Sequence, residues 1–256
     1  MSQTVLITGA SSGIGLELAK LFAKSGHNLI LVARREDKLR SLKEQLVNKH
    51  NVHIDVVVSD LAEVGAAEKL ITEVNARQLV VDILVNNAGF GELGKFTDIS
   101  TERQLSMVRL NVVTLMQLTR LLIPDMLQRQ RGGVLNVGST AAFQPGPNMA
   151  VYYATKAFVL SFSEAIHEEL LDTNIKVTCL APGPTKTGFG EDSGMGNKKI
   201  FSANAMDVAA VAKAGFDGFK ANKAIVIPGF KNKLTAFANR LAPRFVVRKI
   251  VKRLQS

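Results

Sequence analysis

Tyr152 and Lys156 lie four residues apart in a segment with a helical pattern, so their side chains are expected on one helix face. A free phenol has a pKa of roughly 10 and exchanges protons poorly at neutral pH. A nearby ammonium lowers that pKa, because it favours the phenolate. The pair therefore predicts an acid–base catalyst, although the same spacing also occurs in ordinary amphipathic helices.

A glycine-rich turn with the sequence GASSGIG, residues 9–15, follows the first apolar run and opens the first helical pattern. Gly9 suits a tight turn, Gly13 allows the backbone to approach a pyrophosphate, and Gly15 allows the helix to pack closely on a strand. The free N–H groups at the start of that helix favour an anion. The turn therefore predicts a dinucleotide site.

Apolar runs alternate with amphipathic helical patterns along the chain, as positions Ile14, Leu18 and Phe22 illustrate. The continuous Val, Ile and Leu content of the runs is typical of parallel strands covered on both faces. We expect an α/β fold, a doubly wound (Rossmann-type) seven-stranded parallel sheet with helices on both faces, in one domain of residues 1–228. The expected strands are residues 4–8, 28–33, 52–58, 81–85, 134–137, 175–181 and 224–227.

Composition and sequence pattern bear on whether the chain spans a membrane, is secreted or uses its cysteine for chemistry. The apolar stretches are shorter than the roughly 20 residues of a membrane-spanning helix, and the N-terminus carries no signal-peptide pattern. Cys179 is the only cysteine and lies in an apolar strand pattern, so a buried structural thiol is expected. We expect a cytoplasmic protein, with no metal site.

The glycine turn, Asn86-Asn87-Ala88-Gly89 and Tyr152-x-x-x-Lys156 together resemble the short-chain dehydrogenase/reductase family, over about residues 4–228. Further matches are Ser139, Asn111, and Pro182-Gly183 followed by Thr187. The resemblance implies an oxidoreductase that acts on CH–OH or carbonyl groups. The alternative is a non-catalytic dinucleotide-binding or scaffold protein.

The family assigns a role to each matching residue. Tyr152 donates a proton to a carbonyl oxygen as hydride arrives from the nicotinamide, and takes it back in the reverse direction. Lys156 lowers the phenol pKa and holds the nicotinamide ribose, and Ser139 hydrogen-bonds the carbonyl oxygen. Asn111 holds a water that links Lys156 to solvent, or else caps a local backbone group.

NADP(H) is the expected cofactor, with NAD(H) as the alternative. Ala33 stands where NAD-preferring enzymes usually carry an acidic residue, and Arg34 beside it suits a bidentate contact to a 2′-phosphate. In the other interpretation Arg34 and Arg35 only begin an exposed helix. Asp60 lies at the end of the third strand, where the resemblance places a residue beside the adenine ring. A helix N-cap is the other role considered for Asp60, and the two roles are compatible. The expected cofactor-binding residues are Gly9, Ser11, Ser12, Gly13, Ile14, Gly15, Arg34, Arg35, Asp60, Leu61, Asn87, Ala88, Gly89, Tyr152, Lys156, Pro182, Gly183, Thr185 and Thr187.

The substrate side is less defined. Residues 184–206 combine several glycines with apolar side chains and are interpreted as a lid over the substrate. Phe90, Phe143 and Met149 are candidates for an apolar wall, which favours an apolar carbonyl substrate. The sequence indicates neither the substrate itself nor the reaction direction, stereochemistry or oligomer size.

The C-terminal extension, residues 229–256, differs in charge from the rest of the chain. The net charge is +10, of which +8 follows Phe230 with no acidic residue. Two short basic amphipathic helices are predicted, with Leu234, Phe237 and Leu241 on one face of the first helix, and Val247, Ile250 and Leu254 on one face of the second. Packing on the body or a second subunit, peripheral contact with anionic lipid, and nucleic-acid binding are the alternatives, with nucleic acid the least expected. The resemblance also implies a homodimer or homotetramer.

Overall fold

Seven parallel strands form one sheet in the order β3-β2-β1-β4-β5-β6-β7. The computed structural model describes residues 2–194 and 205–255. The strands are β1 (Thr4–Thr8), β2 (Asn28–Ala33), β3 (Ile54–Val58), β4 (Ile83–Asn86), β5 (Gly132–Val137), β6 (Ile175–Leu180) and β7 (Ile225–Val226). Each lies within two residues of its predicted position, and the predicted fold class is confirmed.

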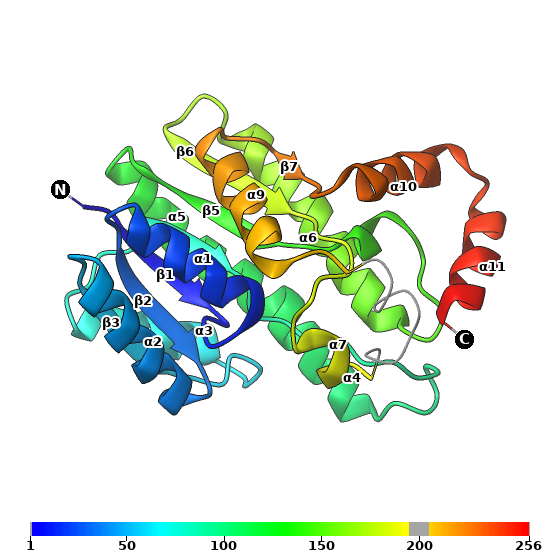
Figure 1. Cartoon of the computed structure of the whole chain (residues 1–256), viewed down its shortest axis with the longest axis horizontal. Helices are drawn as coiled ribbons and strands as arrows, with labels where there is room; N and C mark the ends of the chain where they lie inside the picture. The colour runs from blue at the N-terminus through cyan, green and yellow to red at the C-terminus, as the bar shows by residue number, and fades with distance from the viewer. Residues whose placement is uncertain (1, 195–204, 256) are drawn as a thin grey trace.

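Helices cover both faces of the sheet (Figure 1). On one face, Phe22 of α1, Leu39 of α2 and Phe216 of α9 pack with strand side chains such as Ile7. On the other face, α3, α5 and α6 complete the core. The helices are α1 (Gly13–Lys24), α2 (Glu36–Lys49), α3 (Ala66–Ala76), α4 (Thr101–Val108), the π-helix η1 (Arg109–Thr114), α5 (Leu115–Gln128), the 3-10 helix η2 (Thr140–Phe143), α6 (Ala150–Glu169), α7 (Phe189–Asp192), α9 (Val208–Lys220), α10 (Phe230–Leu241) and α11 (Arg244–Gln255).

The chain reverses its winding direction beside β1, which pairs with β2 on one side and β4 on the other. The segments that leave β1 and β4 therefore diverge to opposite faces of the sheet. A crevice opens at the carboxyl ends of these strands, where open α/β sheets bind their ligands.

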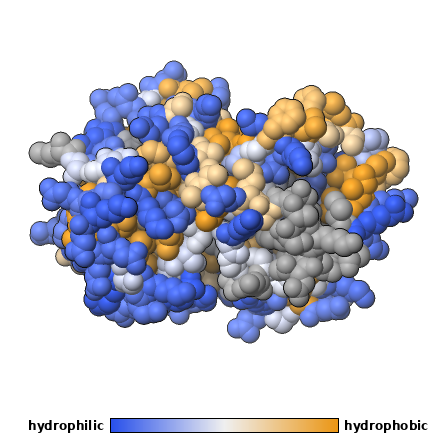
Figure 2. All heavy atoms as spheres, viewed as in Figure 1, coloured by the Kyte–Doolittle hydropathy of each residue, from blue (hydrophilic) through white to orange (hydrophobic). Residues whose placement is uncertain are grey.

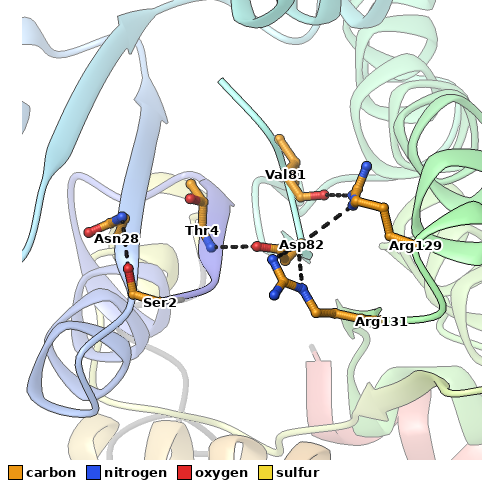
Figure 3. Close-up of polar contacts among 7 residues, drawn as sticks. All are labelled: Ser2, Thr4, Asn28, Val81, Asp82, Arg129 and Arg131. Atoms are coloured by element: carbon orange, nitrogen blue, oxygen red, sulfur yellow. Dashed lines mark hydrogen bonds and ion pairs between the residues drawn. The ribbon is translucent and has the colours of Figure 1, made fainter. Parts of the chain in front are cut away.

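The amino ends of β1 and β4 are joined by a buried carboxylate (Figure 3). Asp82 accepts from the Thr4 backbone N–H at 3.0 Å and from the Arg131 guanidinium at 3.0 Å. Arg129 donates to the Val81 carbonyl at 2.7 Å and lies 3.8 Å from Asp82. This network holds the sheet together at its amino end, away from the crevice at the carboxyl ends.

The consecutive elements α4, η1 and α5 form a helical run, Thr101–Gln128, that is long and apolar enough to cross a membrane by length and composition alone. Met107, Leu118 and Met126 of this run are buried against the rest of the protein. The core helix of a globular domain has the same features, so the run gives no reason to revise the expectation that no segment spans a membrane.

The C-terminal extension forms α10 and α11, beyond β7 (Figure 1). Val247 and Val251 of α11 are buried in a cluster that includes Met149 and Tyr153. The predicted second helix is present, but its apolar face is only partly covered: Ile250 is 53% exposed, and the buried positions are Val247 and Val251.

Candidate active site

The glycine-rich turn joins β1 to α1 at the crevice. Gly9 has a φ of 66°, and a Cβ on it would lie 2.7 Å from the Asn87 amide nitrogen. A Cβ on Gly15 would lie 2.5 Å from the Gly9 carbonyl oxygen. The Asn87 side chain donates to the carbonyls of Thr8 at 2.9 Å and Gly9 at 3.2 Å. Side chains at Gly9 and Gly15 would therefore break the contact between the turn and the end of β4.

The start of α1 is open toward the crevice. Ser12 is the N-cap residue, and its side chain makes no capping hydrogen bond. The first N–H groups of a helix lack intrahelical partners and carry the positive end of the helix dipole. This geometry fits a phosphate group, as the turn sequence predicts.

The two arginines after β2 have different positions. The Arg35 guanidinium donates to the hydroxyls of Ser11 at 2.9 Å and Ser12 at 2.7 Å, so it lies against the glycine turn. Arg34 is 75% exposed and lies 3.5 Å from the Asp60 carboxylate. From the sequence, Arg34 was the first candidate for binding a phosphate of the cofactor. In the structure it is Arg35 that lies against the glycine turn, where a phosphate is expected.

Asp60 closes a turn after β3. Its carboxylate accepts from the Ala62 backbone N–H at 3.0 Å, whereas α3 begins at Ala66 with Gly65 as its N-cap. The helix N-cap interpretation of Asp60 is therefore wrong, because the capped turn ends before the helix starts. The next residue, Leu61, is buried, and its carbonyl accepts from Thr114 at 2.8 Å.

Asn111 lies in the π-helix η1, a rare element that often marks functional positions. Its amide bridges the backbone of Phe90, accepting from the N–H at 3.1 Å and donating to the carbonyl at 2.9 Å. It also donates to the Thr155 hydroxyl at 3.1 Å. Asn111 thus joins the segment after β4 to α6, and its backbone partner Phe90 is 21 residues away, unlike the local backbone group considered from the sequence.

Tyr152 lies within α6 and is 8% exposed. Its phenol is hydrogen-bonded to Ser139, which follows β5 and also accepts from the Ala141 backbone N–H at 3.1 Å. Burial raises the pKa of Tyr152 well above its ordinary value, and the hydrogen bond from Ser139 opposes this only in part. In this arrangement Tyr152 is a neutral phenol at physiological pH and hence a proton donor.

Lys156 lies one turn further along α6, and its amine is 5.9 Å from the centre of the Tyr152 ring. The amine donates to the Val137 carbonyl at 2.8 Å. Burial lowers the pKa of Lys156 to about 8, and the nearby Cys179 thiol raises it only in part. Burial is the dominant influence on the Tyr152 pKa here, and the Lys156 amine is directed to the Val137 carbonyl, so the lowering of the phenol pKa by Lys156 stays a prediction.

These side chains surround a cavity of about 620 Å³ at the carboxyl ends of the strands. Apart from Gly15 and Asn111, all the predicted catalytic and cofactor-binding residues line it. Gly15 and Asn111 act through the backbone segments that they hold in place. Asn86, which the sequence placed just beyond a strand, is instead the last residue of β4 and donates to buried Asn136 at 2.9 Å.

The apolar wall is partly as expected. Phe90 and Met149 line the cavity together with Phe189 of the proposed lid, whose ring centre lies 5.5 Å from that of Tyr152. Phe143 packs with the buried side chains of Leu115 and Val159 and is not part of the lining. Residues 195–204, which include further apolar lid candidates, lie outside the described residues.

Several lining residues were missed from the sequence, among them Arg103, Ser106, Gln144 and Tyr153. Gln144 follows η2 in the segment after β5, so its place after a strand end was an available signal. Cys179 is fully buried, and burial raises its pKa to about 12, as suits a structural thiol. No group of His, Cys, Asp or Glu side chains within residues 2–194 and 205–255 has the arrangement of a metal site.

A family model described as short chain dehydrogenase matches residues 3–197, well over half of the chain. The chain belongs to the short-chain dehydrogenase family. It is therefore an oxidoreductase that acts on alcohol or carbonyl groups, and nicotinamide dinucleotides are the cofactors typical of this family. The predicted family is confirmed.

Individual family members are similar over most of their length. The NADP-dependent 3-hydroxy acid dehydrogenase YdfG of Salmonella typhimurium is 36% identical over 180 residues, which cover 70% of this chain and 71% of the relative. A solved short-chain dehydrogenase from Sphingobium yanoikuyae in complex with NADPH is 32% identical, with a TM-score of 0.83 over 93% of each chain. A solved 7β-hydroxysteroid dehydrogenase is 26% identical, with a TM-score of 0.88 over 99% of this chain and 97% of that chain.

Proposed function

We propose that this short-chain dehydrogenase interconverts an apolar ketone or aldehyde and its alcohol with NADP(H), and that Tyr152 exchanges the proton. The observation that carries the proposal is the buried Tyr152 phenol, hydrogen-bonded to Ser139 within the cavity at the carboxyl ends of the strands. A fold alone supports many activities, so the argument rests on this pair.

The raised pKa of Tyr152 favours the reduction direction. A neutral phenol donates its proton to the oxygen of a carbonyl as negative charge develops there. Ser139 is next to Tyr152 and serves as a second hydrogen-bond donor to the same oxygen. For alcohol oxidation the phenol has to lose its proton, and the Lys156 amine, 5.9 Å from the ring, is the cation that assists this loss.

The preference for NADP(H) over NAD(H) is supported by Arg35, which lies against the glycine turn, and by Arg34, which lies near Asp60. Both line the cavity, and no carboxylate lies at Ala33 to bind a ribose 2′-hydroxyl. The open start of α1 would hold the pyrophosphate, and Lys156 the nicotinamide ribose. When bound, the nicotinamide supplies or accepts the hydride. Asn111 is proposed to orient a water between Lys156 and solvent.

Apolar side chains near Tyr152 support an apolar substrate, since Phe90, Met149 and Phe189 line the same cavity. Self-association through the long helices is also proposed. Apolar side chains of α4, η1 and α5 remain more than a third exposed, as a second subunit would require: Leu105, Val113, Met116, Leu121 and Leu127.

The test is the oxidation of NADPH and of NADH, measured by the wild-type protein against a carbonyl panel. The panel contains bulky apolar ketones, short aldehydes, and 3-oxo acids that match the named activity of the 3-hydroxy acid relative. The proposal expects NADPH turnover that is highest with the apolar ketones. A preference for NADH would contradict the cofactor assignment, and turnover of the oxo acids alone would contradict the substrate class.

A further inference from the structure

The outer face of α10 carries a continuous apolar stripe. Phe230, Leu234, Phe237 and Leu241 follow the 4-3-4 spacing that places side chains on one face of a helix. Their exposed fractions are 79%, 57%, 59% and 74%. Single exposed apolar residues are common on protein surfaces, but a row of four large ones marks an interaction site.

The opposite face of α10 is already used by the body of the protein. Asn232 lies against Gly183 and donates to the Pro228 carbonyl at 2.8 Å, and Ala236 is buried. Asn239 donates to Gln144 at 2.6 Å. The inner face is therefore fixed to the segments that line the cavity, and the apolar stripe points away from the body.

Exposed cations accompany the stripe. All the basic residues of the extension are exposed: Lys231, Lys233, Arg240, Arg244, Arg248, Lys249, Lys252 and Arg253. On α10, Lys231 lies to one side of the apolar stripe, and Lys233 and Arg240 lie to the other side. Figure 2 shows apolar side chains gathered over α10 and α11 beside hydrophilic ones.

We propose that α10 and α11 form a docking surface for an anionic lipid bilayer, with the helices lying parallel to the membrane plane. The apolar stripe then enters the boundary between headgroups and acyl chains, while the flanking cations reach anionic headgroups. The extension is held on the body by the Asn239 bond to Gln144 and by the buried Val247 and Val251, so the docked protein is held in one orientation with the cavity segments close to the membrane.

The charge of the chain favours lipid over a second copy. The extension carries +8, and the rest of the chain carries +2, so a second copy offers no net negative charge on either part. Two extensions packed stripe to stripe would also bring their cations together, which opposes association. Nucleic acid would satisfy the cations but would leave four large apolar side chains without apolar partners.

The experiment is co-sedimentation of the full chain with vesicles of phosphatidylcholine, alone or with phosphatidylserine. A stripe variant carries Phe230→Ser, Leu234→Ser and Phe237→Ser, and a charge variant carries Lys231→Gln, Lys233→Gln and Arg240→Gln. One matched control replaces exposed apolar residues elsewhere, as Val64→Ser, Phe96→Ser and Leu171→Ser. The other replaces exposed lysines of α2 and α3, as Lys38→Gln, Lys49→Gln and Lys69→Gln.

The proposal expects wild-type protein to bind the phosphatidylserine vesicles and to release them at high salt. The charge variant should bind about 100-fold more weakly, since each cation near the surface of an anionic bilayer contributes roughly fivefold in affinity. The stripe variant should lose binding, whereas both controls should bind like the wild type. Unchanged thermal unfolding midpoints would show that the substitutions leave the fold intact.

Either of two experiments could overturn the proposal. One is the co-sedimentation, if wild-type binding does not depend on phosphatidylserine or does not occur at all. The other is light scattering without lipid, where a fall in the molar mass of the stripe variant would show that a second copy covers the stripe. An unchanged mass together with selective vesicle binding supports the lipid surface.

Discussion

Replacing Lys156 with Met should change how the stability of the protein depends on pH. Lys156 is 6% exposed, and its amine donates to a neutral carbonyl, that of Val137, at 2.8 Å. Burial disfavours the ammonium form and lowers the pKa of Lys156 from 10.5 to about 8. The folded protein therefore binds fewer protons at this position than the unfolded chain when the pH lies between these two values.

The magnitude follows from linkage. The lowering from 10.5 to about 8 corresponds to a cost of roughly 3 kcal/mol in the free energy of unfolding at neutral pH, at 1.36 kcal/mol per pKa unit. The cost is fully present below pH 8 and disappears as the pH rises through 10.5. Between pH 7 and pH 10, wild type should therefore gain about 2–3 kcal/mol of stability relative to Lys156→Met. The loss of the Val137 hydrogen bond is nearly independent of pH, so it cancels in this comparison.

The assay is urea unfolding followed by circular dichroism at pH 7, 8, 9 and 10, without added cofactor. Lys69→Met, on the exposed surface of α3, is the control and should give a pH profile parallel to wild type. Parallel profiles for wild type and Lys156→Met would mean that burial does not disfavour the charged amine, contrary to this prediction.

Further predictions concern the cofactor, the sheet and the extension. Arg35→Ala should raise the KM for NADPH by at least tenfold and leave the KM for NADH unchanged. Arg34→Ala should raise the KM for NADPH less, because Arg34 is exposed. Equal changes in KM for the two cofactors would show that these arginines do not bind a 2′-phosphate. Asp82→Asn should lower the free energy of unfolding by about 1–3 kcal/mol in urea titrations, because it breaks the ion pairs of a buried carboxylate with partly exposed arginines. The KM should change little, because Asp82 does not line the cavity, and a loss of activity without a loss of stability would contradict this. The double variant Val247→Ala and Val251→Ala should lower the free energy of unfolding by about 2–4 kcal/mol. It should also raise the KM for the carbonyl substrate, because both valines pack in one cluster with Met149 and Tyr153. An unchanged KM would show that the extension does not influence the active site.

The strands could be predicted from the sequence because they are buried on both faces. Such strands read as uninterrupted Val, Ile and Leu runs, as in β2, and their ends are marked by polar or glycine residues. The site lies where these ends meet, so Gly9, Ser139 and Asp60 could be located from strand order alone. Family resemblance then supplied the roles that position could not.

The remaining features depend on side-chain directions that the sequence pattern leaves open. Neighbouring Asn86 and Asn87 point to opposite sides at the end of β4, so the residue that faces the turn depends on where the strand stops. Arg34 and Arg35 also point in different directions. Arg34 lies toward Asp60, and Arg35 donates to the hydroxyls of the glycine turn. The Lys156 bond to the Val137 carbonyl depends on a side-chain rotamer that the four-residue spacing from Tyr152 does not determine.

In the C-terminal extension, too, the sequence pattern left the directions of the side chains undetermined. Its amphipathic pattern predicted two helices but not which face packs on the body. In α10 the polar and small residues Asn232, Ala236 and Asn239 face inward, and the apolar stripe remains exposed. On this inner face Asn239 donates to Gln144, Asn232 lies against Gly183, and Ala236 is buried.

Tyr152→Phe shows whether the Tyr152 phenol supplies the proton. The substitution removes one hydroxyl while the ring keeps its contact with Phe189. NADPH affinity, followed by fluorescence titration, should remain nearly unchanged, while kcat/KM for carbonyl reduction should fall by about 10²–10⁴-fold. Tyr153→Phe, which removes the neighbouring hydroxyl, should have a much smaller effect. Carbonyl reduction by Tyr152→Phe at close to the wild-type rate would contradict the assignment.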